Sequence, residues 1–153
     1  LSIVRPFRLL EKYAGRENEV KFIQFLESNP QYIEWWFKNG TGKDAYGIRY
    51  TDHATNKERI FYPDWIIKFR GKDVLGIFDT KGGFTASESE VKDKAEYLAA
   101  KIVSLNANPQ KRFLYYGGIL IQQEGLWLYN DNLNYSNYAT NKAVWKNFTD
   151  LFK

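Results

Sequence analysis

One stretch of the sequence, RIFYPDWIIKFRGKDVLGIFDTKGG from Arg59 to Gly83, limits the folds open to this chain more than any other. Two apolar runs typical of strands flank a short turn, and each run contains a carboxylate, Asp64 in the first and Asp79 in the second. A buried charge without a compensating partner is strongly destabilising. The pattern therefore predicts that something binds these two carboxylates in the folded protein.

The turn between the two runs determines which residues face each other. Arg70–Asp73 suits a two-residue hairpin turn, with Gly71 at the first central position, where φ is positive. With that turn, antiparallel pairing places Asp64 directly opposite Asp79, and like charges at facing positions are destabilising. Because side chains alternate along a strand, Lys81 lies on the same face, two residues beyond Asp79. A cation between the carboxylates reverses the repulsion, and a metal ion and the lysine ammonium both suit this place.

Apolar periodicity and breaker residues divide the chain into a helix, four strands, a helix, two strands and a helix. The expected ranges are a helix at 17–29, strands at 31–40, 45–52, 59–69 and 74–81, a helix from within 85–91 to about Ser104, strands at 111–123 and 125–130, and a helix at 140–152. Two capping boxes suit the start of the second helix, Thr85 with Glu88 and Ser87 with Glu90. Pro63 lacks a backbone donor and predicts a distortion or a sheet edge beside Asp64. This order predicts an α/β or α+β fold, a mixed β-sheet flanked by helices.

Composition supports one domain and removes several kinds of chemistry. A chain of 153 residues with 44% hydrophobic residues is long enough for a sizeable core, so we expect 1–153 to form a single domain. The chain has no cysteine, and its one histidine is His53, which argues against disulfides, thiol nucleophiles, Ser-His-Asp triads and multi-histidine metal sites. His53 itself lies in the polar stretch TDHATNKE and is interpreted as a solvated loop residue. Any catalysis is then expected to use carboxylates and lysines.

The charge and the ends of the sequence bear on partners and location. The net charge of +4 permits a polyanionic partner without requiring one. The chain begins at Leu1, contains no methionine, and shows neither a signal-peptide pattern nor an apolar run long enough to span a membrane. We therefore expect a domain cut from a longer cytoplasmic protein, and the lack of cysteine fits that reducing compartment.

Two facing carboxylates beside an ammonium suit the hydrolysis of a phosphodiester bond. Their oxygens favour Mg²⁺ or Mn²⁺, which lower the pKa of bound water and neutralise charge that develops at phosphate. Asp64 and Asp79 would bind the ion, and the carbonyl of Thr80 could add an oxygen while its side chain points to the opposite face. Lys81 would position the attacking water or stabilise a phosphate oxygen. The alternative is structural, with Asp79 and Lys81 as an ion pair and Asp64 capping a strand end.

Three further features each have two interpretations. Glu19 lies on the inward stripe of the first helix, so it is either an additional metal ligand or a glutamate that suits a first turn. Lys94, at the margin of the apolar stripe of the second helix, either contacts phosphate or snorkels to solvent. The adjacent Trp35 and Trp36 point to opposite faces of a strand, where they serve either base stacking or core packing.

These segments resemble a known family. The order of YPD on one strand, a hairpin, an apolar strand ending in DTK and a lysine-bearing helix resembles the PD-(D/E)xK nuclease superfamily, which has a restriction-endonuclease-like fold. More narrowly, FIQFLE, WWFKNG, FYPDWIIKF and GIFDTKGG in this order resemble the nuclease domain at the C-terminus of type III restriction enzyme Res subunits and related helicase-nucleases.

The resemblance implies Mg²⁺-dependent cleavage of DNA. Asp64, Asp79 and Lys81 match the three signature positions, with aspartate at Asp79 where glutamate is commoner, and Glu19 matches the acidic position of the first helix. The family also implies a helicase or translocase domain in the same polypeptide and a modification or recognition subunit as partners. The alternative is a DNA-binding or scaffolding module that has the same fold and does not cut.

Overall fold

The computed structural model describes residues 17–82 and 89–153. Its centre is a six-stranded sheet in the order β1-β4-β5-β6-β7-β8. The strands are β1 (Ile33–Lys38), β4 (Trp65–Phe69), β5 (Val74–Thr80), β6 (Leu114–Gln123), β7 (Leu126–Asn130) and β8 (Lys146–Asn147). Strands β5 and β6 pair in parallel, and the other neighbours pair antiparallel. The chain is therefore a mixed α+β protein, as the sequence predicts.

Helix α1 (Glu17–Glu27) and the C-terminal 3₁₀ helix η3 (Phe148–Phe152) cover one face of the sheet. Phe22 of α1 is fully buried there, on the inward stripe that the helical spacing predicts. Its ring meets those of Trp65 and Phe148 edge-on, at centroid distances of 5.3 and 5.4 Å. This aromatic core holds α1 against β4 and the C-terminal segment.

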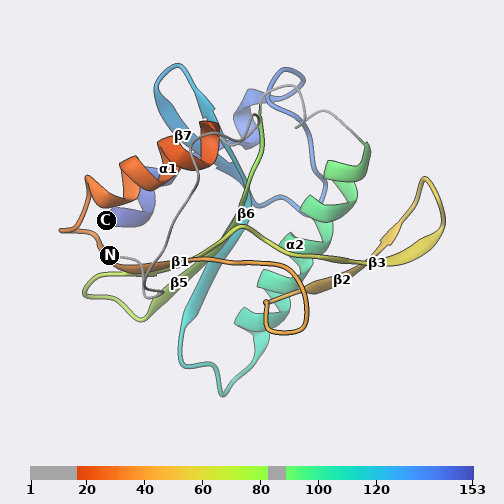
Figure 1. Ribbon diagram of the computed structural model, residues 1–153, viewed down its shortest axis with the longest axis horizontal. Helices are drawn as coiled ribbons and strands as arrows, with labels where there is room; N and C mark the ends of the chain where they lie inside the picture. Colours follow the sequence, from red (N-terminus) through yellow and green to blue (C-terminus); the bar gives the residue numbers. More distant parts are fainter. Residues whose placement is uncertain (1–16, 83–88) are drawn as a thin grey trace.

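Helix α2 (Ser89–Ala107) covers the opposite face, so the sheet lies between two helical layers (Figure 1). Leu98 of α2 packs in one buried cluster with Ile77 of β5. Gly117 of β6 makes this close approach possible, because a Cβ there would overlap the carbonyl oxygen of Ile77 and the side chain of Ile102. The side chains of β5 therefore divide between the two layers, with alternate residues facing α2.

Strands β2 (Ile48–Asp52) and β3 (Lys57–Phe61) form a separate two-stranded sheet. This hairpin packs beside α2, where the rings of Tyr50 and Tyr97 lie 6.2 Å apart, and its turn extends away from the main sheet (Figure 1). The sequence correctly predicts a strand within 45–52. It does not predict that this strand lies outside the main sheet.

The single strand expected at 59–69 is wrong, because strand structure stops after β3 and begins again only at β4. Pro63 has no N–H for a strand ladder. Its carbonyl oxygen instead accepts a hydrogen bond from the Asn39 side chain at 2.8 Å, and the Asn39 backbone N–H donates to the Asp64 carbonyl at 2.7 Å. The distortion expected at Pro63 is confirmed, and it leaves Asp64 at the start of β4 rather than inside a strand.

The pairing expected between β4 and β5 is confirmed. The paired residues are Trp65 with Phe78, Ile66 with Ile77, Ile67 with Gly76, and Lys68 with Leu75. Gly71 in the connecting turn has a φ of 71°, as the predicted turn requires. Continued by one residue, this register brings Asp64 opposite Asp79.

The helix expected at 140–152 is wrong. The segment forms the 3₁₀ helix η2 (Lys142–Val144), the short strand β8 and the 3₁₀ helix η3. Trp145 is buried on the α2 side of the sheet, whereas Phe148 is buried in the core on the α1 side. A single amphipathic helix buries one stripe, so it could not supply both residues. Helical structure instead begins again after Asn147, whose side chain caps η3 by accepting a hydrogen bond from the Thr149 backbone N–H.

The other expected elements are confirmed with small shifts of their ends. Helix α1 ends at Glu27, and α2 continues past Ser104 to Ala107. The expected capping boxes of α2, Thr85 with Glu88 and Ser87 with Glu90, involve positions outside the described residues. Within residues 17–82 and 89–153, no helix has both the length and the apolar character needed to cross a membrane.

Candidate active site

The candidate site lies where β4 begins and β5 ends. The Asp64 carboxylate there is held on two sides. Its Oδ2 accepts a hydrogen bond from the backbone N–H of Thr80 at 2.9 Å, and its Oδ1 lies 2.6 Å from Lys38 Nζ. Because Thr80 belongs to β5 and Lys38 ends β1, Asp64 joins three neighbouring segments at one end of the sheet. These contacts orient the carboxylate before any ligand binds.

Asp79, near the end of β5, is the most deeply buried charged group of the site. Only 2% of its surface is exposed, and its Oδ2 lies 2.8 Å from Lys81 Nζ. The Lys81 side chain is 24% exposed, so its ammonium lies between the buried carboxylate and solvent. The backbone N–H of Lys81 donates to the Leu120 carbonyl at 2.9 Å, which extends the pairing with β6 and fixes the chain there.

Burial, and after it the nearby charge of Asp64, raise the pKa of the Asp79 carboxyl to about 7. The ammonium groups of Lys81 and Lys38 act in the opposite direction and only partly offset this effect. Asp79 therefore titrates near neutral pH when no other cation is close. An additional positive charge at this place would favour the ionised carboxylate.

Burial by itself lowers the pKa of the Lys81 ammonium. The neighbouring carboxylate of Asp79 more than reverses this, with smaller contributions from Asp64 and Glu90, so the pKa of Lys81 is raised overall. Lys81 therefore remains a cation at neutral pH, and Asp79 is the member of the pair whose charged form is, on balance, disfavoured by burial. A permanent positive charge at this position suits the stabilisation of an anion.

Lys38 is a site residue that the sequence reasoning missed. Its Nζ lies 2.6 Å from Asp64 Oδ1 and 3.4 Å from Glu19 Oε2, and 4.9 Å from the centroid of the Trp65 ring. It therefore connects helix α1 to the start of β4 and brings Glu19 close to Asp64, while a role for Glu19 as a metal ligand stays a prediction. The signal was present in WWFKNG, where Lys38 follows the buried Trp36 by two residues and so shares its face.

Thr80 has the orientation that the alternation of β5 predicts. Its hydroxyl oxygen accepts a hydrogen bond from the indole N–H of Trp65, on the α1 side of the sheet. Its backbone N–H binds Asp64, on the side of the carboxylates. Thr80 therefore positions Asp64 through its backbone, and coordination of a metal by its carbonyl stays a prediction.

Lys94 lies in the second turn of α2, where its Nζ is 2.6 Å from Glu90 Oε1 and 5.9 Å from the centroid of the Phe61 ring. The hydrogen bond from Lys94 lowers the pKa of Glu90, and the charge of Glu90 in turn raises the pKa of Lys81. The start of α2 is thus electrostatically linked to the site. A phosphate contact by Lys94 stays a prediction, and it would require Lys94 to exchange Glu90 for the phosphate.

His53 is exposed, as predicted for a loop residue, but its ring has a defined partner. The side chain is 68% exposed, and Nδ1 lies 2.7 Å from Asp93 Oδ1. The His53 backbone N–H donates to the other oxygen of Asp93 at 2.9 Å. The buried Asp93 of α2 therefore anchors the turn of the β2–β3 hairpin. No local pattern predicts this pair, because its members are forty positions apart and belong to different elements.

The residues of the site suit a divalent metal. Asp79 Oδ2 and Glu19 Oε2 are buried and accept no hydrogen bond within the described residues, although a lysine ammonium lies near each. Asp64, Asp79 and Glu19 are thus the acidic side chains beside the two ammonium groups of Lys38 and Lys81. Over residues 17–82 and 89–153, no group of three or more Asp, Glu, His or Cys side chains is arranged to hold a metal. The site therefore offers two facing carboxylates, and Mg²⁺ is commonly held by one or two carboxylates with water.

Comparisons with protein-family models, curated proteins and solved structures find no match to this chain.

Proposed function

We propose that the chain is a divalent-metal-dependent endonuclease domain that hydrolyses DNA phosphodiester bonds. The supporting observation is the arrangement of Asp64, Asp79 and Lys81 at one end of the β4–β5 hairpin. There, a buried carboxylate that titrates near neutral pH faces a second carboxylate and contacts a partly exposed ammonium at 2.8 Å. A bound Mg²⁺ or Mn²⁺ would supply Lewis-acid activation of water and neutralise negative charge at phosphate.

In this proposal each residue of the chain has a separate role. Asp64 and Asp79 hold the metal, with the Thr80 carbonyl as a further oxygen and Glu19 as an additional acidic group. Lys81, kept cationic by Asp79, stabilises charge that develops on a phosphate oxygen or orients the attacking water. Lys38 keeps Asp64 and Glu19 close together when no metal is bound.

We also propose that the fold is restriction-endonuclease-like and that the domain belongs to a type III restriction or related helicase-nuclease enzyme. The support is the resemblance of the segments around Asp64 and Asp79, together with a mixed sheet whose β4–β5 hairpin carries both carboxylates. The expected partners are DNA, a helicase or translocase domain in the same polypeptide, and a modification or recognition subunit.

Nicking of supercoiled plasmid in Mg²⁺ or Mn²⁺ tests the proposed activity. Lys81→Ala should lower the cleavage rate about 10²-fold or more, because an oriented charge acts chiefly on charge that develops in the transition state. Lys101→Ala, which removes an exposed lysine of helix α2 away from the site residues, is the control and should cleave at the wild-type rate. A folded Lys81→Ala protein that cleaves as fast as wild type would exclude the catalytic role.

A second function is favoured by one specific observation. Each carboxylate of the pair already has an ammonium partner, Lys38 for Asp64 and Lys81 for Asp79, so the cluster could serve structure alone. The chain would then be a non-cleaving DNA-binding or scaffolding module. In that case Lys81→Ala should destabilise the metal-free domain by about 3–5 kcal/mol, because it leaves Asp79 as an uncompensated buried charge. The wild-type domain would also remain inactive when joined to its motor.

A further inference from the structure

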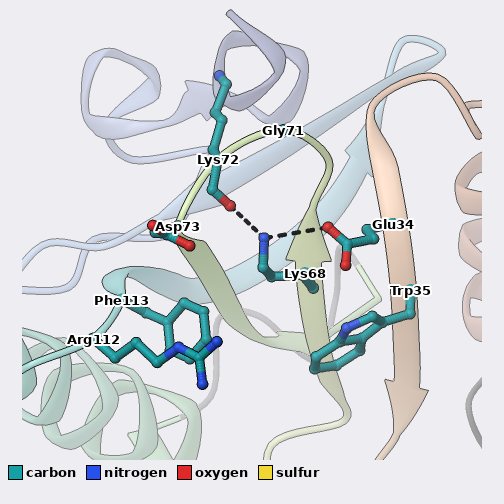
Figure 2. A pocket seen from close by; sticks show the side chains of 8 residues that line it. All are labelled: Glu34, Trp35, Lys68, Gly71, Lys72, Asp73, Arg112 and Phe113. Atoms are coloured by element: carbon teal, nitrogen blue, oxygen red, sulfur yellow. Dashed lines mark hydrogen bonds and ion pairs between the residues drawn. The ribbon is translucent and has the colours of Figure 1, made fainter.

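A second concave site lies at the other end of β4, beside the turn of the β4–β5 hairpin. It is a cavity of about 460 Å³ whose lining includes Glu34, Trp35, Lys68, Asp73, Arg112 and Phe113 (Figure 2). The lining comes from β1, β4, the hairpin turn and the residues just before β6. None of the residues assigned to the candidate active site lines it. The cavity is therefore a separate place at which a ligand could bind.

Lys68 forms the floor of this cavity and is an unusual residue to bury. Its surface is only 9% exposed, and its ammonium donates to the carbonyl oxygens of Phe69, at 3.0 Å, and Lys72. It also lies 3.4 Å from Glu34 Oε2, so it joins β1 to the hairpin turn (Figure 2). Because these contacts engage the Lys68 ammonium, the cavity has a defined shape before any ligand binds.

The side chains above this floor offer both flat surfaces and charge. Trp35 and Phe113 are half-buried and contribute their rings from opposite sides of Lys68 (Figure 2). The Arg112 guanidinium lies 5.2 Å from the centroid of the Phe113 ring. Arg112 is exposed and makes no ion pair with a carboxylate of residues 17–82 or 89–153, so it can bind an anion. The carboxylates of Glu34 and Asp73 complete the lining as hydrogen-bond acceptors.

The chemistry of the lining restricts the ligand. A partner must bring a flat ring for Trp35 and Phe113, an anion for Arg112, and donors for the two carboxylates. A nucleobase with its phosphate has all three, since its faces stack on aromatic rings and its edge carries N–H donors, as the ring N–H of thymine does. We propose that this cavity binds one unpaired base, with its phosphate, of a nucleic-acid strand. The identity of the strand as the substrate rests on the proposed nuclease function.

The position of the cavity suits a strand that also reaches the candidate active site. Trp35 pairs with Lys68, which stands four residues after Asp64 along the same β4 segment. At about 3.3 Å per residue, the two places are about 13 Å apart on the same face of the sheet. Phe37 and Ile66 lie between them, also on that face and half-buried. A single strand could therefore stack in the cavity while its backbone continues toward the carboxylates.

Trp35 offers a direct measurement of this binding. It is the half-buried member of the chain's five tryptophans, whereas Trp36, Trp65, Trp127 and Trp145 are buried. Trp36 thus confirms core packing for one residue of the adjacent pair, and Trp35 is left on the side of the cavity. In metal-free buffer, where cleavage cannot interfere, a short oligothymidylate should quench the tryptophan fluorescence.

Variants of the lining test the proposal by fluorescence anisotropy of a labelled oligothymidylate. Trp35→Ala should weaken binding about tenfold, the range found for loss of one stacked base. Trp35→Phe should keep most of the affinity and lose the quenching, which guards against a folding defect in the alanine variant. Arg112→Ala should weaken binding and reduce the slope of log affinity against log salt by about one.

A matched pair elsewhere in the chain provides the control. Lys142 lies 5.2 Å from the centroid of the Tyr138 ring, the same spacing as Arg112 and Phe113, but on the segment after β7. Tyr138→Ala and Lys142→Ala should leave the affinity for oligothymidylate unchanged. An equal loss in these variants would indicate non-specific binding to exposed aromatic and basic groups and would overturn the assignment of the cavity.

The remaining outcomes separate the sources of the ligand and the two proposals. Quenching by a mononucleotide as strong as by the oligomer would identify a free nucleotide as the ligand and overturn the role of a strand. A blunt duplex that competes as well as the single strand would overturn the requirement for an unpaired base. Wild-type affinity in Trp35→Ala, with no quenching in the parent protein, would refute base binding in the cavity even if the protein cuts DNA. Binding that depends on Trp35 in a protein that never cuts would instead retain the cavity and refute the nuclease.

Discussion

Replacement of Asp79 by asparagine should change how the stability of the domain depends on pH. In the folded protein, burial raises the pKa of Asp79 from 3.8 to about 7, so the folded state holds this proton more tightly than the unfolded chain does. The contribution of Asp79 to stability is therefore fully present below about pH 3.8 and is lost as the pH rises through about 7. Asp79→Asn removes this titration and should flatten that part of the profile.

The size of the effect follows from the pKa values of the two states. Between these two pKa values the free energy of unfolding falls by about 1.4 kcal/mol per pH unit. The wild type should therefore lose about 3 kcal/mol relative to Asp79→Asn between pH 5 and pH 8, nearly all of it below about pH 7. That is a large fraction of the stability of an ordinary domain. Because other groups titrate in both proteins, the quantity to compare is the difference between their free energies of unfolding.

Urea unfolding followed by tryptophan fluorescence, in metal-free buffer at several pH values, measures this difference. Asp79→Asn should gain on wild type steadily from pH 5 to about pH 7 and then level off. Profiles that remain parallel across this range would refute the argument, because they would mean that Asp79 has the same proton affinity in the folded and unfolded states.

Two further predictions concern ligands of the site. Millimolar Mn²⁺ should raise the midpoint of thermal unfolding, and at ten times Kd the gain in free energy of unfolding is about 1.4 kcal/mol. Asp64→Asn should abolish this shift, and Lys38→Met should enlarge it because the Lys38 ammonium competes with the metal for Asp64. An unchanged wild-type midpoint would count against a metal site. Lys94→Ala should weaken DNA binding equally for all sequences and lower the slope of log affinity against log salt by about one. Lys92→Ala, which removes the lysine of another i,i+4 pair on α2, should change neither quantity. An unaltered slope in Lys94→Ala would mean that Lys94 only pairs with Glu90.

The part of the site that the sequence predicted is the part set by local geometry. Gly71 fixes a two-residue turn, and strand alternation then determines that Asp64 faces Asp79 with Lys81 on the same side. The orientation of the Thr80 side chain away from the carboxylates follows from the same alternation. These relations span fewer than twenty residues, and a turn type with a period of two is sufficient to derive them.

The sequence predicted less where a segment contacts more than one layer. The closing segment was expected to be a helix because its apolar residues have helical spacing. In the fold, Trp145 fills the α2 side and Phe148 fills the α1 side, so the segment crosses the edge of the sheet. Which faces are open at that edge depends on the order of the strands, and local periodicity contains no information about that order.

The sequence by itself determined helices α1 and α2, most of the strands, the β4–β5 register and therefore the central carboxylate pair. Only the tertiary structure decided which residues from distant segments contact one another. Lys38 reaches Asp64 because β1 lies beside β4, and Asp93 reaches His53 because the β2–β3 hairpin packs on α2. The cavity beside Trp35 likewise needs four segments to meet. Local hydrogen bonding fixes a hairpin from its own residues, whereas contacts between distant segments follow from how the whole sheet and both helical layers bury their apolar faces.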